Sequence, residues 1–264
     1  MSNSNKVPLS ADPWQQLRNF TRARIALGRV GSSLPTKEVL DFGMAHAMAR
    51  DAVHLALDAD ELAASLQLAG YSTCQVHSCA QDRQTYLLQP DLGRRLDDAS
   101  IVKLEAIKLP IGADLLIVVG DGLSSLAVKR HVQPLLEEIS RCMPTEWNIG
   151  DIVIVRQARV AIGDEIAAIL GARMVVMLIG ERPGLSSPDS LGLYLTFDPK
   201  VGRSNAERNC ISNVRPEGLS YSAAARKLIC LARGAMRLKL TGVGLKDQSE
   251  EREIDLKKVP TLSG

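Results

Sequence analysis

An α/β fold is predicted by this sequence of 264 residues, on the strength of two observations. From about residue 112 onward, short apolar segments alternate with segments of helical periodicity. Segments that are apolar on both faces and separated by helices are typical of strands buried in a parallel sheet. Before residue 111, helical periodicity predominates. We therefore predict a Rossmann-like, doubly wound and mostly parallel sheet, preceded by a smaller helical N-terminal domain.

The N-terminal segment 1–110 is predicted to be mainly helical. Apolar residues recur near a spacing of 3.6 in "DPWQQLRNFT" (12–21) and in "TKEVLDFGMAHAMARDAVHLAL" (36–57). The loop "TYLLQPDLGRRL" (85–96) carries Arg94 and Arg95, which either form salt bridges in a surface turn or contact a partner or a phosphate group. The apolar residues that can share one face of the second helix are Val39, Leu40, Met44, Ala47, Met48, Ala52 and Leu55.

The segment 111–244 is predicted to form the sheet domain. Strands are expected in "ADLLIVVGDGLSS" (113–125), "DIVIVRQARV" (151–160), "ARMVVMLIGERPG" (172–184) and "LGLYLTFDP" (191–199). Helices are expected over 124–142, 163–170 and 220–240. Pro134 should kink or split the first helix, and Ser220 or Ser222 should cap the last one. The charged, aperiodic segment 245–264 is predicted to be a disordered tail.

The overall charge and composition exclude two classes of partner. The formal net charge is +2, from 32 basic and 30 acidic residues, so no strong basic field attracts nucleic acid or an anionic membrane. Aromatic residues make up only 3% of the chain, which disfavours a base-stacking platform. The longest apolar runs are too short to cross a bilayer. We expect neither a nucleic-acid nor a membrane partner.

The five cysteines indicate a reducing compartment. Their number is odd, and the polar start of the sequence lacks the apolar core of a signal peptide, so we expect reduced thiols and a cytoplasmic protein. Cys74 and Cys79 are too far apart for a CxxC site, and only His77 lies near them. We therefore expect no metal site.

Three loops follow the first three predicted strands of the sheet domain. They are "GDGLSS" (120–125), "RQARV" (156–160) and "GERPGL" (180–185). Ligands of doubly wound sheets bind beyond the carboxyl ends of the strands, so neighbouring strands would bring these loops to one rim. Glu181 and Arg182 would lie at that rim, on a backbone restrained by Pro183 and Gly184.

A dinucleotide is the first ligand to consider at such a rim. "GDGLSS" has the first two glycines of the fingerprint, but Ser125 stands at the last position. The second strand ends in Arg156 rather than in the acidic residue that would bind a ribose. No GxSxG motif is present, which disfavours a hydrolase. A stand-alone Rossmann-like nucleotide-binding protein or dehydrogenase remains the alternative hypothesis.

A series of motifs gives the sequence a family resemblance. "ARIALGRVG", "DLGRRL", "GDGLSS", "ILGA", "GERPGL" and "RNCISN" occur in this order. In these motifs, over about residues 10–240, the chain resembles the small subunit of ethanolamine ammonia-lyase. It departs from the family in lacking the long N-terminal extension of some members and in its charged tail beyond about residue 245.

The resemblance implies a carbon–nitrogen lyase that uses adenosylcobalamin to convert ethanolamine to acetaldehyde and ammonia by radical chemistry. It also implies a hetero-oligomer with a large TIM-barrel subunit, which carries the substrate site and most of the chemistry. The small subunit would close over part of the cobalamin and contribute no catalytic residue. The resemblance places the enzyme in the cytoplasm or inside a bacterial microcompartment.

Three cobalamin contacts of the family fall on Val160, Glu181 and Cys210 of this sequence. A corrin is broad, largely neutral and fringed with amide groups, so Glu181 would accept amide hydrogen bonds and Val160 would pack against the macrocycle. The sequence lacks the DxHxxG motif through which some cobalamin enzymes bind cobalt with a histidine. The resemblance therefore implies base-on cobalamin, with its own benzimidazole as the lower ligand.

Overall fold

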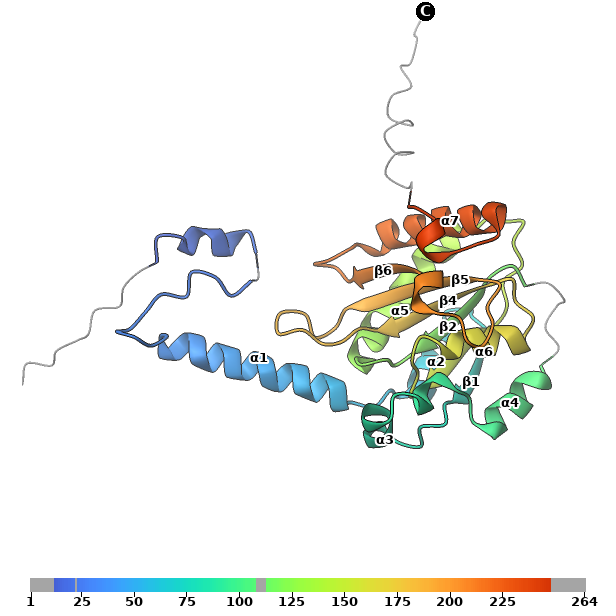
Figure 1. Ribbon diagram of the computed structural model, residues 1–264, viewed down its shortest axis with the longest axis horizontal. Coiled ribbons are helices and arrows are strands. Elements are labelled where there is room, and N and C mark those ends of the chain that lie inside the picture. The colour runs from blue at the N-terminus through green and yellow to red at the C-terminus, as the bar shows by residue number, and fades with distance from the viewer. Residues whose placement is uncertain (1–11, 22, 108–112, 248–264) are drawn as a thin grey trace, which may run out of the picture.

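A six-stranded sheet with the order β1-β3-β2-β4-β5-β6 lies at the centre of the computed structural model (Figure 1). The structure describes residues 12–21, 23–107 and 113–247. The strands are β1 (Thr73–His77), β2 (Leu116–Gly120), β3 (Ile152–Arg156), β4 (Met174–Gly180), β5 (Leu191–Phe197) and β6 (Asn209–Val214). β1, β3, β2 and β4 run parallel to one another, whereas β5 runs antiparallel to both β4 and β6.

The protein is therefore α/β, as predicted, and its sheet is mixed: three pairs of neighbouring strands are parallel and two are antiparallel. The antiparallel half follows from the short connections. Residues 181–190 join β4 to β5 without a helix, and a parallel return needs a longer crossover. The four strands expected from the sequence are confirmed as β2 to β5. β1 and β6, which form the two edges of the sheet, were not predicted from the sequence.

Helices cover both faces of the sheet. Apolar residues of α2, α5 and α7 share one core with alternate strand residues such as Ile117, Ile154 and Val176. Residues of α4 and α6 share a second core on the other face with Val118, Val155 and others. The helices are α1 (Thr36–His54), α2 (Ala59–Leu68), α3 (Arg83–Leu88), α4 (Asp98–Glu105), α5 (Ser125–Cys142), α6 (Ile162–Ile169) and α7 (Tyr221–Leu238).

The predicted helix ends agree closely with the structure. Ser124 caps α5 by accepting a hydrogen bond from the Ala127 N–H, and Ser220 caps α7 by accepting one from the Ala223 N–H. α5 continues through Pro134, so the expected split does not occur. Side chains on both sides of this proline are fully buried against the sheet and α7, which holds the helix together.

The helix α1 projects away from the α/β body (Figure 1). The expected helix over 12–21 is only a short 3₁₀ helix, Gln15–Asn19, and its Arg18 forms an ion pair with Glu38 of α1 at 2.8 Å. Of the seven apolar residues predicted to share a face on α1, only Ala52 is buried. Large apolar residues left exposed here include Val39, Leu40, Met44, Met48 and Leu55.

The predicted domain boundaries can be compared with the structure at several positions. β1 comes from the segment 1–110 and pairs with β3, so this segment contributes an edge strand to the sheet. The predicted limit between residues 110 and 111 lies outside the described residues. At the start of the predicted tail, Leu245 is buried beneath α7 and Asp247 pairs with Lys227 at 2.8 Å. Residues 248–264 of that tail lie outside the described residues.

Candidate functional site

The three predicted rim loops lie together, as expected, because β2 lies between β3 and β4 in the sheet. The N–H of Leu123, after β2, donates to the carbonyl of Gly180 at the end of β4, at 2.9 Å. The carboxylate of Asp121 accepts hydrogen bonds from the N–H groups of Gln157 and Ala158 after β3, at 3.0 and 2.7 Å. Backbone groups thus join the three loops into one surface.

The glycines of "GDGLSS" are explained by this close packing. Gly122 has a φ of +56°, and a Cβ added there would lie 2.1 Å from the carbonyl oxygen of Gly180. The hydroxyl of Ser124 accepts the Ala127 N–H and donates to the Pro188 carbonyl. Protein groups therefore occupy the start of α5, where a dinucleotide would place its pyrophosphate. This arrangement disfavours the dehydrogenase alternative.

A buried ionic network supports the rim from below. Asp121 is fully buried and pairs with the guanidinium of Arg83 at 3.1 Å, while Arg83 also donates to the Val53 carbonyl at 2.8 Å. Burial raises the pKa of the Asp121 carboxyl, and Arg83 and the backbone N–H groups oppose this effect. The carboxylate therefore depends on these partners to remain charged.

The buried side chain of Tyr86 extends this network to the loop after β3. Its hydroxyl donates to the Ala158 carbonyl at 2.8 Å, and the guanidinium groups of Arg83 and Arg159 lie over its ring, 4.8 and 4.3 Å from the centroid. Burial raises the pKa of the Tyr86 hydroxyl, so it remains a neutral donor.

Above this network, the loops enclose an open cavity of about 450 Å³. Its wall is apolar and aromatic on one part and charged on another, which suits a large ligand with polar edges. The lining residues are Tyr86, Gly122, Leu123, Arg159, Val160, Ile179, Gly180, Glu181, Arg182 and Tyr194.

Two of the three predicted site residues, Val160 and Glu181, line this same cavity. One oxygen of Glu181 accepts the Asn213 N–H at 3.1 Å, and Glu181 also donates its own N–H to the Ser190 carbonyl at 2.9 Å. The carboxylate is thus held in place by the backbone. It forms no salt bridge among the described residues.

The third predicted residue, Cys210, lies on β6 opposite Tyr194 of β5, and Tyr194 lines the cavity. Partial desolvation raises the pKa of the Cys210 thiol, so the neutral thiol predominates at neutral pH. Tyr194 and Arg159 were not found from the sequence, since neither stands out from its strand or loop. The sequence offered a signal for Arg159 alone, which directly precedes the predicted contact Val160.

The two arginines of the predicted loop 85–96 have structural partners. Arg94 pairs with Asp91 at 2.9 Å, and Arg95 pairs with Glu165 at 3.1 Å. Glu165 also accepts the N–H of Leu96 at 2.8 Å. These contacts agree with the interpretation of this loop as a surface turn with salt bridges.

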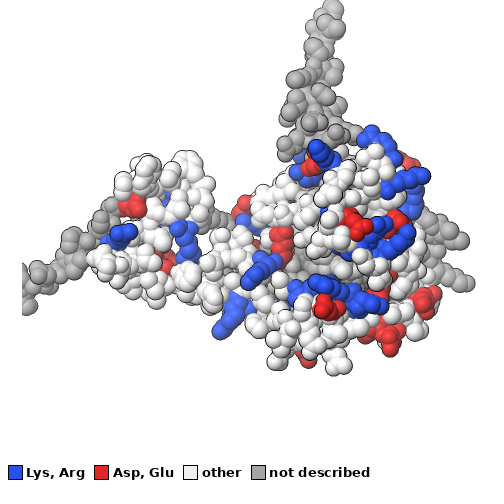
Figure 2. Space-filling view, viewed as in Figure 1, with Lys and Arg blue, Asp and Glu red and all other residues white. Residues whose placement is uncertain are grey.

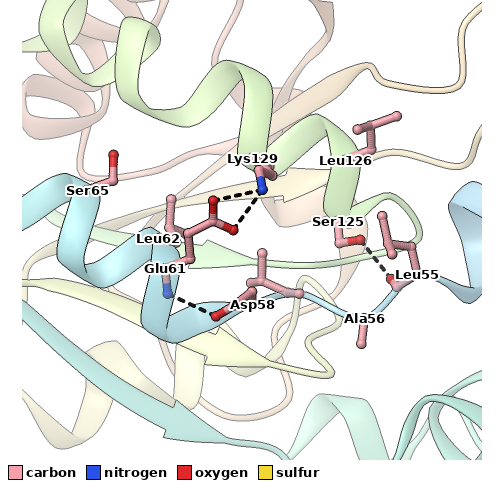
Figure 3. A pocket seen from close by; sticks show the side chains of 10 residues that line it. Leu55, Ala56, Asp58, Glu61, Leu62, Ser65, Ser125, Leu126 and Lys129 are labelled. Atoms are coloured by element: carbon pink, nitrogen blue, oxygen red, sulfur yellow. Dashed lines mark hydrogen bonds and ion pairs between the residues drawn. The ribbon is translucent and has the colours of Figure 1, made fainter.

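A second cavity, of about 320 Å³, lies between α2 and α5 (Figure 3). Lys129 pairs across it with Glu61 at 2.7 Å, and the Ser125 hydroxyl donates to the Leu55 carbonyl at 2.7 Å. Asp58 accepts the N–H of Glu61 as the cap of α2. Because these polar groups bind one another, this cavity is a less suitable ligand site than the rim.

Fold and rim together define an α/β protein with an open cavity at the carboxyl ends of its parallel strands. A family model for the ethanolamine ammonia-lyase light chain matches residues 11–246. The chain is 54% identical over 262 residues to an ethanolamine ammonia-lyase small subunit of Pseudomonas putida (strain W619), covering 98% of this chain and 96% of that one. It is 55% identical over 255 residues to that of Azotobacter vinelandii (strain DJ / ATCC BAA-1303), covering 96% and 94%. The chain belongs to the ethanolamine ammonia-lyase light-chain family.

Proposed function

We propose that this chain, as the small subunit of ethanolamine ammonia-lyase, helps bind adenosylcobalamin at the rim cavity. The enzyme would convert ethanolamine to acetaldehyde and ammonia, with the substrate site and most of the chemistry on a large TIM-barrel subunit. The proposal rests on the observation that Val160 and Glu181 line the same cavity. Cys210 lies on β6 opposite Tyr194 of β5, and Tyr194 also lines this cavity.

The residues present fit an amide-fringed macrocycle. Glu181 uses one carboxylate oxygen for the Asn213 N–H, which leaves the other as an acceptor for a corrin amide. Val160 offers an apolar contact, and the half-buried Tyr194 adds aromatic surface. A cavity of about 450 Å³ is too small for a whole corrin. It suits a subunit that covers one edge of the cofactor while a partner covers the rest.

Bound adenosylcobalamin would supply an adenosyl radical by homolysis of its cobalt–carbon bond. The role of this chain is then to bind, orient and shield the cofactor. None of the four histidines lines the cavity: His46 and His54 lie on α1, His77 ends β1, and His131 is buried in α5. We propose that the cofactor would be bound base-on, with no histidine of this chain as a ligand of the cobalt.

The large subunit is the proposed partner. On the face seen in Figure 2, uncharged side chains cover most of α1 and the segment before it. Contiguous exposed apolar surface marks an interaction site in a soluble protein, and α1 supplies Leu40, Met44 and Met48. None of the helices in the described part of the chain has the length and apolar character of a membrane span. We propose a location in the cytoplasm or in a bacterial microcompartment.

The fold supports a further part of the proposal. β1, β3, β2 and β4, with helices on both faces, fit a Rossmann-like, doubly wound plan for this half of the sheet. We propose that residues 111–244 act as the cobalamin-binding domain, with β1 added from the preceding segment.

Glu181→Ala tests the proposal in the assembled two-subunit enzyme. Removing a charge-assisted contact of roughly 1.5–3 kcal/mol should lower cobalamin affinity by roughly ten- to a hundredfold. Glu105→Ala, at an exposed position on α4, is the control and should leave affinity unchanged. Equilibrium dialysis and thermal unfolding should be measured on the same preparation. Unchanged affinity with a clearly lower melting temperature would show that Glu181 is structural.

A further inference from the structure

The arginines near the carboxyl edge of the parallel strands fall into two groups. Arg83, Arg95 and Arg156 each have a carboxylate partner, Asp121, Glu165 and Asp60, at 3.1, 3.1 and 3.0 Å. Arg159 and Arg182, which line the cavity, have no carboxylate partner among the described residues. At this edge of the sheet, the two arginines without a carboxylate partner among the described residues are therefore the two that line the cavity.

Arg159 is held in position although it lacks a counter-ion. Its guanidinium lies 4.3 Å from the centroid of the Tyr86 ring, and Nη2 donates to the Tyr86 carbonyl at 3.3 Å. Its Nε is buried without a hydrogen-bond partner. A guanidinium fixed by stacking retains donors for a further acceptor, and it loses little conformational entropy on binding one.

Arg182 supplies the second charge from the loop after β4. It is exposed, and it forms no hydrogen bond or ion pair with the residues that the structure describes. Glu181 is the single acidic residue in the cavity wall, and its carboxylate already accepts the Asn213 N–H. The two arginines therefore leave the cavity with a net positive charge.

We propose that Arg159 and Arg182 form an anion subsite that binds a phosphate group. Guanidinium groups match phosphate oxygens with paired N–H donors, and the bonds are charge-assisted. The inference rests on the proposed function: the phosphodiester of the nucleotide loop is the anionic group of base-on cobalamin. The subsite would then turn the nucleotide-loop side of the cofactor toward this subunit.

Two cobalamin precursors allow the contribution of the phosphate group to binding to be measured separately from that of the rest of the ligand. Adenosylcobinamide lacks both the phosphate and the benzimidazole, whereas adenosylcobinamide phosphate adds the phosphate alone. Their dissociation constants should be measured by equilibrium dialysis on the two-subunit enzyme. Variants are Arg159→Gln, Arg182→Gln and the double variant, with Arg156→Gln as the control because Arg156 pairs with Asp60 outside the cavity.

The wild-type enzyme should prefer the phosphorylated precursor by roughly ten- to a hundredfold. Each single variant should lose most of this preference, the double variant should lose all of it, and Arg156→Gln should keep it. Because Arg182 is exposed, its variant should fold normally even if Arg159→Gln loosens the stack on Tyr86. A preference that survives in the double variant would overturn the subsite.

Further measurements distinguish the remaining explanations. Titration with inorganic phosphate, followed by phosphorus NMR, tests a free anion as the occupant. Arginine-dependent phosphate binding without a preference for the phosphorylated precursor would overturn the nucleotide-loop assignment. A wild-type enzyme that fails to bind adenosylcobalamin would overturn the proposed function itself, whereas normal cobalamin binding by the double variant would refute only the subsite.

Discussion

Asp121, in the loop after β2, accepts hydrogen bonds from the loop after β3. Its removal should lower the free energy of unfolding. Asp121→Ala would leave the Arg83 guanidinium buried without a counter-ion and would free the N–H groups of Gln157 and Ala158. Removing one partner of a buried ion pair costs roughly 3–5 kcal/mol. Urea unfolding should report a loss of that size in the free energy of unfolding.

Asp91→Ala is the matched control for this change, because Asp91 forms an exposed pair with Arg94 at 2.9 Å. An exposed pair contributes less than about 1 kcal/mol. Equal losses in the two variants would contradict the role assigned to the buried network.

His131 should make stability depend on pH. Burial lowers the pKa of His131 below its ordinary value, while Asp189, 3.6 Å away, acts in the opposite direction. Arg130 also lowers this pKa, and the Tyr221 hydroxyl lies 2.8 Å from Nδ1. The neutral ring is therefore favoured in the folded state.

The unfolded chain binds the proton first as the pH falls through about 6.5, so this contribution to stability is present above that pH and is lost below it. The melting temperature should fall between about pH 7.5 and about pH 5.5, and less steeply in His131→Gln. Parallel curves for the two proteins would rule out His131 as the source.

At the scale of secondary-structure elements, the turn between β2 and α5 depends on one glycine. Gly122→Ala would combine a left-handed conformation with an overlap against the Gly180 carbonyl. The free energy of unfolding should fall by roughly 2–6 kcal/mol. Gly171 has a φ of +68° and open space around it, so its substitution measures the conformational cost without an overlap.

Gly171→Ala should therefore cost only about 1–2 kcal/mol. Chemical denaturation of both variants makes the comparison. A loss for Gly122→Ala no larger than that for Gly171→Ala would mean that the β2–α5 turn can move away from β4.

At the scale of the whole molecule, α1 carries large apolar residues that the described part of the chain leaves exposed. If the large subunit covers it, Met44→Glu should weaken assembly of the two subunits by at least about tenfold, since a charge would enter an apolar interface. Leu68→Glu places the same charge at a leucine that is 91% exposed on α2 and serves as the control. Sedimentation of mixed subunits measures both, and equal effects would argue against α1 as the interface.

The local pattern of the sequence determined much of this fold. Runs such as "LLIVV" and "MVVMLI" are apolar on both faces, which a buried strand requires, and serine caps set the starts of α5 and α7. β1 and β6 escaped prediction because edge strands need fewer apolar residues: Cys74 and Val76 are the buried positions of β1. The rim containing Val160 and Glu181 followed from the strand ends alone.

The tertiary structure decided which of these elements meet and which charges remain free. Arg83 lies 38 residues from Asp121 and Arg95 lies 70 from Glu165, so only the order of strands in the sheet could pair them. The same order left Arg159 and Arg182 at the cavity without such partners. The exposed face of α1 has the periodicity of a buried helix. The spacing of apolar residues predicts that one face of a helix packs against another surface. It does not indicate whether that surface belongs to the same chain or to a partner.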